Sequence, residues 1–328
     1  MQLGIFVVSA AVSLAASVLL VSRLERLGER LGMSEALLGL MAALAADGPE
    51  ITASVTAIAS GHGTVGIGVT LGSNVFNLAA LLGLSALIAG RIGFHRREVI
   101  LEGSVGLWVA GLSLAVVGGL IAPAIGLLLA LIVFVPYVAI SAQHPANRAR
   151  LRLPQRWSEW LARALAEEEA ELAEAIHPEP GDPRDAAVAL VAGIVVVAAS
   201  VAMEQAATAM GSQIGLSAIV VGGLILAGVT SVPNAVAAVY LATRGRGAAT
   251  LSEAFNSNAF NVIVGLLVPG AILGLARPSG DALFVAGCYL LLTAASVALA
   301  LRGRGLDRRA GSVIIVSYVV FAVVLATR

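Results

Sequence analysis

The string G-S-N-V-F-N at residues 72–77 is matched in the second half of the chain by N-S-N-A-F-N at residues 256–261. A proline precedes each string, and both Pro49 and Pro233 stand 24 residues before the serine of the string that follows. The matched positions of the two segments differ by a constant 184 residues, without gaps. This internal repeat predicts two structurally equivalent halves.

The chain around these strings is strongly apolar. Of its 328 residues, 59% are hydrophobic and only 12% are charged, about half of the ~25% charged residues in a typical soluble domain. The formal net charge is zero, so no large basic surface is available to bind nucleic acid. This composition excludes a soluble enzyme, a disordered chain and a nucleic-acid-binding protein, and it indicates a helical protein embedded in the lipid bilayer.

Ten stretches are long and apolar enough to cross a bilayer as helices. They cover approximately residues 3–22, 34–60, 63–90, 98–118, 120–141, 185–204, 214–242, 247–275, 281–301 and 311–327. We therefore predict an all-α polytopic membrane protein with a five-helix half at 1–141, a linker loop at 142–184 and a second five-helix half at 185–328. The repeated segments occupy about 36–88 and 219–271.

The placement of arginine predicts the orientation, because cytoplasmic loops are rich in basic residues. With the N-terminus outside, eighteen of the twenty basic residues lie on the cytoplasmic side, and only Arg277 and Arg328 lie outside. Five helices separate the repeated segments, so the second repeat is inverted, as in many secondary transporters. We expect a multi-pass monomer of the plasma (inner) membrane with both termini outside and the 142–184 loop cytoplasmic. That loop contains a helix-prone linker at Gln155–Ile176.

Two carboxylates flank a predicted helix break in the string A-D-G-P-E at residues 46–50. Proline removes a backbone donor and clashes with the preceding turn, so carbonyl oxygens are freed there. A charge in the middle of a membrane helix costs about 2.5–3.5 kcal/mol or more and is functional by default. No Arg lies inside a predicted span to pair with Asp47 or Glu50. We therefore expect both residues to act on a cation.

The corresponding break in the second half offers hydroxyl and amide groups in place of carboxylates, from Thr230, Ser231 and Asn234. In the helices that follow the two breaks, each Ser is spaced four residues from an Asn, which places the two side chains on one helix face. These pairs are Ser73 with Asn77 and Ser257 with Asn261. All of these groups are hard oxygen ligands, which suit Na⁺, Ca²⁺ or Mg²⁺.

Several polar residues leave an alternative open. Ser73 and Ser257 could instead serve close helix packing, and Asn74 and Asn258 are as suited to packing or capping as to ligation. Glu253 stands near the start of the eighth span, either beside the site or its pathway or at a solvated helix start. The four histidines lie in loops, which argues against a histidine proton relay. Three further glutamates near span ends are expected to reach water: Glu98, Glu102 and Glu204.

The two repeats resemble the cation/calcium exchanger superfamily, which comprises the sodium/calcium exchangers and their prokaryotic relatives. The repeats of that superfamily typically read G-T-S-x-P-E followed by G-N-x-x-G-S-N-x-F-N. This chain reads A-A-D-G-P-E at 45–50 and G-V-T-L-G-S-N-V-F-N at 68–77. The second half reads G-V-T-S-V-P-N at 228–234 and S-E-A-F-N-S-N-A-F-N at 252–261. The resemblance covers both repeats and the ten-helix plan, and so nearly the whole chain.

The resemblance implies a Na⁺/Ca²⁺ antiporter that works by alternating access, with four ion sites between the repeats, no enzymatic activity and no bound cofactor. In the family, the Glu after each Pro binds Ca²⁺; Glu50 matches the first, and Asn234 replaces the second. Asp47 replaces a family Ser, and Val69 and Glu253 replace the Asn of the G-N pair. The implied metal ligands are Asp47, Glu50, Ser73, Asn77, Thr230, Ser231, Asn234, Ser257 and Asn261.

The shift of a carboxylate from one repeat to the other leaves the coupling ion open. Two carboxylates three positions apart repel each other unless a cation or a proton lies between them. We therefore hypothesise that a divalent cation still binds and that a proton takes over one step of Na⁺ coupling. The alternatives are a proton-coupled or other divalent-cation exchanger, and an ion-binding sensor that does not transport. An intramembrane protease is excluded because it would need a second catalytic Asp in the interior of another span.

Overall fold

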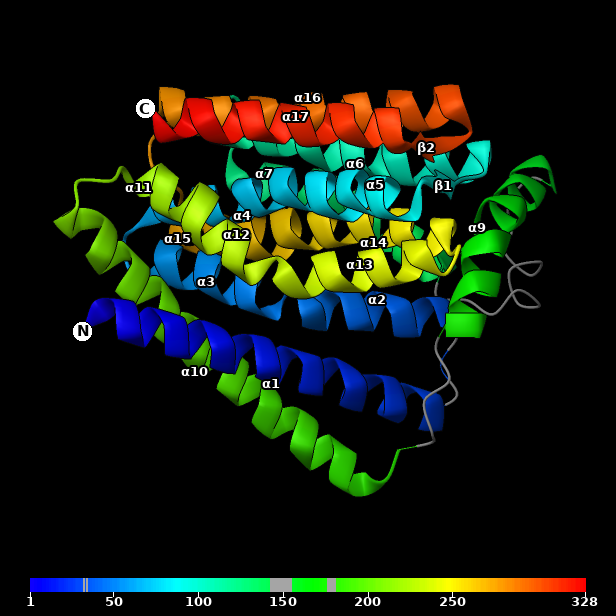
Figure 1. The fold of residues 1–328 in the computed structure, drawn as a ribbon, viewed down its shortest axis with the longest axis horizontal. Helices are drawn as coiled ribbons and strands as arrows, with labels where there is room; N and C mark the ends of the chain where they lie inside the picture. Colours follow the sequence, from blue (N-terminus) through cyan, green and yellow to red (C-terminus); the bar gives the residue numbers. More distant parts are fainter. Residues whose placement is uncertain (32, 34, 142–154, 176–180) are drawn as a thin grey trace.

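The structure is a computed structural model that describes the whole chain except residues 32, 34, 142–154 and 176–180, and it is almost entirely helical (Figure 1). The first half contains α1 (Gln2–Arg30), α2 (Glu35–Ala46), α3 (Gly48–Ala59), α4 (Gly63–Asn77), π-helix η1 (Leu78–Leu84), α5 (Ser85–Ala89), α6 (Arg96–Val117) and α7 (Pro123–Ser141). Helix α9 (Gln155–Ala175) follows. The second half contains α10 (Pro183–Gln213), α11 (Ala218–Val220), η2 (Val221–Leu226), α12 (Ala227–Thr230), α13 (Val232–Thr243), α14 (Gly247–Phe260), η3 (Asn261–Leu267), α15 (Val268–Leu273), α16 (Gly280–Gly303) and α17 (Arg308–Ala326).

The predicted all-helical, polytopic membrane fold is confirmed. In the described part of the chain, eight helices are long and apolar enough to cross a membrane, and a bent helix pair makes a ninth candidate. The stretch expected as the second span consists of α2 and α3, two helices of 12 residues each that meet at Asp47. One feature was not predicted: strands β1 (Arg91–Gly93) and β2 (Gly305–Asp307) form a small antiparallel sheet between two loops.

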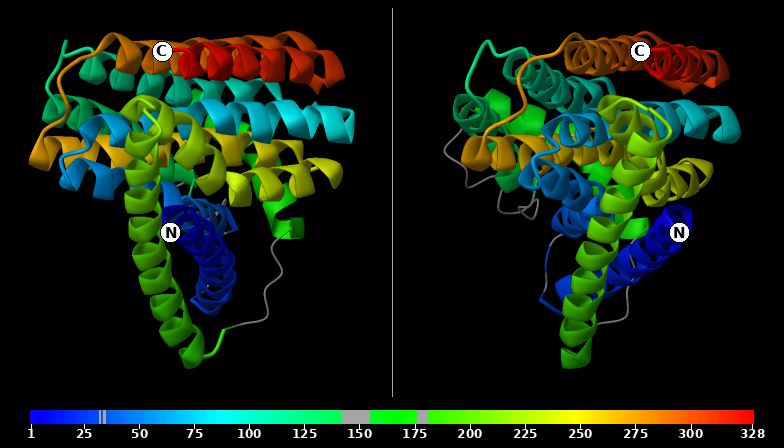
Figure 2. Two further views of the ribbon diagram at one scale, coloured as in Figure 1. Left: turned by 60° about the vertical axis from the view of Figure 1, so that its left-hand side comes forward. Right: turned by 90° about the vertical axis from the view of Figure 1, so that its left-hand side faces the viewer.

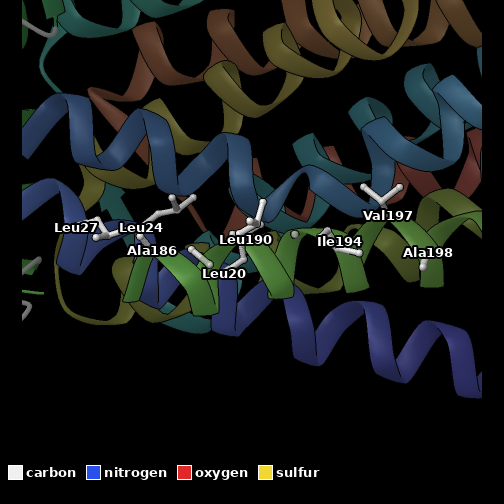
Figure 3. Close-up of a pocket in the computed structure, with 10 residues that line it drawn as sticks. Leu20, Leu24, Leu27, Ala186, Leu190, Ile194, Val197 and Ala198 are labelled. Carbon is white, nitrogen blue, oxygen red and sulfur yellow. The ribbon is translucent and has the colours of Figure 1, made fainter. Parts of the chain in front are cut away.

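Helices α1 and α10 form a pair on one side of the molecule, at a steep angle to most of the other helices (Figure 2), and they pack against α2 and α3. The hydroxyl groups of Ser13 and Ser200 join the pair through a hydrogen bond of 2.8 Å, and the guanidinium of Arg23 lies 2.8 Å from the carboxylate of Asp185. A groove of about 710 Å³ lies between these helices, and Leu, Ala, Gly, Ile and Val residues line it (Figure 3). A groove of this composition suits lipid chains and not ions.

Helix α9 lies across one end of the bundle, against the ends of α2, α6 and α14, whereas both termini lie at the other end (Figure 1). Ala164 and Leu165 of α9 are buried there. The backbone N–H of Ala249, in the first turn of α14, donates to Oε2 of Glu171 at 2.8 Å, so a carboxylate caps the positive end of α14. The helix expected in the linker is therefore formed, and it is packed against the bundle.

The expectation that three glutamates near span ends reach water was wrong, because Glu98, Glu102 and Glu204 are at most 1% exposed. The phenol of Tyr137 donates to Glu102 at 2.7 Å, and the hydroxyl of Thr208 donates to Glu204 at 3.0 Å. The physical reason is tertiary packing. Helix α10 continues to Gln213, so Glu204 lies well within it, whereas Glu98 lies in the first turn of α6 and accepts from the backbone N–H of His95 at 3.3 Å. Helices that are distant in sequence pack against α6, and the length of an apolar stretch does not reveal this.

Helix α4 and η2 approach each other so closely that their backbones touch. A Cβ atom on Gly72 would lie 2.4 Å from the carbonyl oxygen of Gly223, and one on Gly222 would lie 2.2 Å from that of Val65. Small residues permit this approach, which is typical of packed membrane helices. The crossing joins the two halves directly beside the strings that carry the repeat.

We expect Gly72→Ala to destabilise the protein by about 1–3 kcal/mol or more, the usual cost of overpacking. The measurement is the apparent midpoint of thermal unfolding in detergent. Gly111→Ala in α6 is the matched control, because a Cβ atom there would meet nothing within 4 Å. Equal midpoints for the two variants would contradict the close backbone contact.

Candidate cation site

Two helix breaks face each other in the centre of the bundle. Asp47 stands between α2 and α3 and Ser231 stands between α12 and α13, in each case two residues before a proline. Proline is well tolerated in the first turn of a helix but not further inside it, so α3 and α13 begin afresh at these points. The second break bends the chain by 47°.

The two breaks are joined by hydrogen bonds between equivalent positions. The amide of Asn234 donates to Oδ1 of Asp47 at 2.6 Å, and the hydroxyl of Ser231 donates to Oε1 of Glu50. Asp47 and Ser231 are equivalent under the 184-residue offset, as are Glu50 and Asn234. The same contact is therefore made twice, once from each half.

Ser257 of α14 brings the eighth predicted span into this group. Its hydroxyl donates to Oδ1 of Asp47 at 2.6 Å and accepts from the amides of Asn234 and Asn77, each at 3.1 Å. The equivalent Ser73 is buried but has no hydrogen-bond partner. The site is consequently asymmetric, because the extra carboxylate at position 47 engages the serine of the opposite half.

Four asparagines link α4 to α14 beside the breaks. The amides of Asn74 and Asn258 each donate to the backbone carbonyl of the other residue, at 2.9 and 3.2 Å. Asn77 donates to Oδ1 of Asn258, and Asn261 donates to Oδ1 of Asn74, both at 3.2 Å. Asn74 and Asn258 thus tie the two helices together, in keeping with the packing alternative.

Five oxygen atoms of the predicted ligands are buried and have no hydrogen-bond partner. They are Oδ2 of Asp47, Oγ of Ser73 and the Oδ1 atoms of Asn77, Asn234 and Asn261. Buried polar atoms are almost always paired with a protein group, water or an ion. Oxygen atoms in this number suit a hard cation, since Ca²⁺ takes six to eight oxygen ligands. The residues therefore fit the cation that the sequence predicts.

Asp47 and Glu50 are almost fully buried, at 0% and 1% exposure. Neither forms an ion pair with a described Arg or His residue. Among the described residues, no three His, Cys, Asp or Glu side chains come together as a metal site, so most ligands here would be neutral oxygens. Buried charges without a partner are strongly unfavourable, and a bound cation or proton would stabilise this pair.

The nine predicted ligands differ in their contacts. Thr230 lies at the second break, and its hydroxyl donates to the carbonyl of Leu226 at 2.9 Å, which occupies its proton but not its lone pairs. Hydrogen bonds connect six of the predicted residues into one network, whereas Ser73 and Thr230 make no direct bond to those six. The amide of Asn261 donates to Asn74 beside this network. The six connected residues are Asp47, Glu50, Asn77, Ser231, Asn234 and Ser257.

Ser54 forms a polar group next to the site that was not predicted from the sequence. The hydroxyl of Ser54 lies 2.7 Å from that of Thr70 and 2.9 Å from the carbonyl oxygens of Gly66 and Gly265. Ser54 stands one helical turn after Glu50, and this spacing could have identified it. These contacts hold α3 against α4 and η3 and so support the position of Glu50.

Comparison with known proteins identifies the family. A profile described as "Sodium/calcium exchanger protein" matches residues 1–142 and 185–327. The chain belongs to this family. It is thus a membrane antiporter of cations and not an enzyme, as the repeats predict.

Two curated relatives share part of the sequence. A "Putative antiporter CaxA" of Alkalimonas amylolytica is 26% identical over 306 residues, which cover 89% of this chain and 88% of the relative. The human "Sodium/potassium/calcium exchanger 4" is 40% identical over 73 residues, which cover 22% of this chain and 12% of the relative.

Two solved structures share the fold. A structure of the sodium-calcium exchanger NCX_Mj soaked with Na⁺ and Sr²⁺ has a TM-score of 0.64 at 18% identity, over 97% of this chain and 96% of the other. The H⁺/Ca²⁺ exchanger CAX has a TM-score of 0.69 at 17% identity, over 99% of this chain and 85% of the other. Exchangers named for different coupling ions thus share this architecture.

Proposed function

We propose that the protein is a secondary active antiporter that exchanges Ca²⁺ for Na⁺ by alternating access. The observation that carries this proposal is a set of five unpartnered, buried oxygens, one of them on Asp47 itself, at two carboxylates that form no ion pair with a described basic residue. These oxygens come from both halves, as expected for a site between repeats. The nine predicted metal ligands would hold the transported ions, with Glu50 and Asp47 supplying the charge.

The two halves would be arranged around this site as inverted repeats, at 1–141 and 185–328, with the 142–184 segment on the cytoplasmic face. The position of both termini at the end opposite α9 supports this orientation (Figure 1). Helices α1 and α10 carry none of the proposed ligands and would move across the core to open either side. We propose that the antiporter works as a monomer in the plasma (inner) membrane.

A second candidate is proton coupling on the same fold. It is favoured by the carboxylate of Asp47, which stands where the family motif has Ser and hydrogen-bonds to Ser257 and Asn234. A proton bound between Asp47 and Glu50 would relieve their repulsion in the same way as a cation. The likeness to the H⁺/Ca²⁺ exchanger CAX is compatible with this candidate.

Radioactive Ca²⁺ uptake into proteoliposomes tests the two candidates. Vesicles loaded with Na⁺ are compared with vesicles that carry an imposed pH gradient, and vesicles without protein are the control. We expect an outward Na⁺ gradient alone to drive uptake. Uptake that requires a pH gradient would establish proton coupling. Ion binding without uptake under either gradient would contradict transport and favour an ion-binding sensor.

A further inference from the structure

Glu253 is the only residue of α14 between Gly247 and Ala259 that is not buried. It is the seventh residue of the helix, and the six that precede it are buried, so it does not belong to a solvated helix start. A partly exposed carboxylate within an otherwise buried helical segment keeps part of its hydration. We therefore expect a water-filled crevice around Glu253.

The crevice lies beside the proposed site. Glu253 and Ser257 are four residues apart on one helix and therefore share a face. Ser257 uses that face to donate to Oδ1 of Asp47 at 2.6 Å. Glu253 thus lies about one turn, ~6 Å, from this contact, toward the end of α14 that Glu171 of α9 caps.

The electrostatic surroundings of Glu253 are negative. The charged groups that act on it through space are Asp47 and Glu25, both of which are carboxylates. Glu253 itself makes no hydrogen bond or ion pair with another described residue. Asp47 is fully buried, and its Oδ2 is unpartnered. Among the described residues, none of these three carboxylates, which come from three separate elements, forms an ion pair with a basic side chain. Such an arrangement attracts cations.

We propose that Glu253 provides an additional binding position for a divalent cation, on the route between the α9 end of the molecule and the central site. Its carboxylate binds hydrated Ca²⁺ in the crevice before the ion passes to Asp47 and Glu50. This inference rests on the proposed function, and it adds a residue that acts on one face of the membrane only. The proximity of Glu25 on α1 extends the negative route toward the same end of the bundle.

Ca²⁺ uptake is measured against Ca²⁺ concentration in right-side-out and everted membrane vesicles, under the gradient that drives the wild type. We expect Glu253→Gln to raise the half-saturating Ca²⁺ concentration about fivefold when Ca²⁺ is supplied at the α9 face, as for the loss of one partly solvated charge contact. When Ca²⁺ is supplied at the opposite face, we expect the half-saturating Ca²⁺ concentration of Glu253→Gln to equal that of the wild type. The matched control is Glu159→Gln, which removes a half-exposed carboxylate on the outer surface of α9.

An unchanged value at the α9 face, or equal increases at both faces, would overturn the inference while the proposed function stands. A wild type that transports no Ca²⁺ would overturn the proposed function itself. In that case, equilibrium binding of radioactive Ca²⁺ to the purified protein decides about Glu253. Weak binding that survives in Glu50→Gln and disappears in Glu50→Gln/Glu253→Gln supports the inference, and equal binding by these two variants overturns it.

Discussion

Glu50→Gln is expected to lower the rate of Ca²⁺ uptake at least about 100-fold. Removing one partner of a buried charge contact costs about 3–5 kcal/mol, and each 1.36 kcal/mol is a factor of about ten in rate. Glu50 is 1% exposed, and the side chains of Ser231 and Asn234 contact its two oxygens. The amide of Gln keeps the size of the side chain but removes its charge, so the loss reports on cation binding and not on packing.

The measurement is the initial rate of Ca²⁺ uptake into proteoliposomes that contain equal amounts of each variant. Glu159→Gln, which makes the same chemical change on the exposed surface of α9, is expected to transport like the wild type. The thermal midpoint of Glu50→Gln in detergent should stay at or above that of the wild type, because no buried charge remains at this position. Full transport by Glu50→Gln would remove Glu50 from the site.

The double variant Asp47→Ser/Asn234→Glu moves a carboxylate from position 47 to position 234. We expect it to transport Ca²⁺ faster than the single variant Asn234→Glu. Asn234→Glu alone would place three carboxylates in contact, because Asn234 lies 2.6 Å from Asp47 and 3.4 Å from Glu50. Such repulsion should strongly reduce transport. Adding Asp47→Ser restores two carboxylates and should recover the rate about tenfold, within the range of coupling between contacting residues.

The single variant Asp47→Ser tests the coupling ion in the same assay. A carboxylate at position 47 can bind a proton in competition with a metal ion, and a serine hydroxyl cannot. The decline of transport toward acidic pH should therefore be shallower in Asp47→Ser than in the wild type. Identical pH profiles would exclude Asp47 as the proton-binding group. If the effects of Asp47→Ser and Asn234→Glu on the transport rate simply add in the double variant, positions 47 and 234 do not share one site.

Much of this architecture could be predicted because it depends on short-range patterns. The 184-residue offset, the two prolines and the apolar stretches identify the helices and the two breaks. The Ser and Asn pairs four residues apart identify one helix face. The type of ligand follows as well, since these positions offer oxygen lone pairs and neither imidazole nor sulfur. The family is confirmed by the match over both halves.

These local patterns could not predict which side chains are buried by helices that are distant in sequence. Glu98, Glu102 and Glu204 lie at or near the ends of predicted spans, yet they are buried because helices that are distant in sequence cover them. The two-stranded sheet joins residues 91–93 to 305–307, which are too far apart in sequence to be paired by any local rule. The packing of Ala164 and Leu165 against the bundle likewise depends on where α9 lies.

The sequence by itself determined which residues form the two breaks, because helix geometry and proline sterics act within a few residues. Only the tertiary structure decided how the equivalent residues divide their contacts. Ser257 donates to Asp47, whereas its equivalent Ser73 stays unpartnered. Glu253 is partly exposed for a similar reason, because its exposure depends on helices that are distant in sequence. Hydrogen bonding and burial are set by these neighbours, and their positions follow from the packing of the whole bundle.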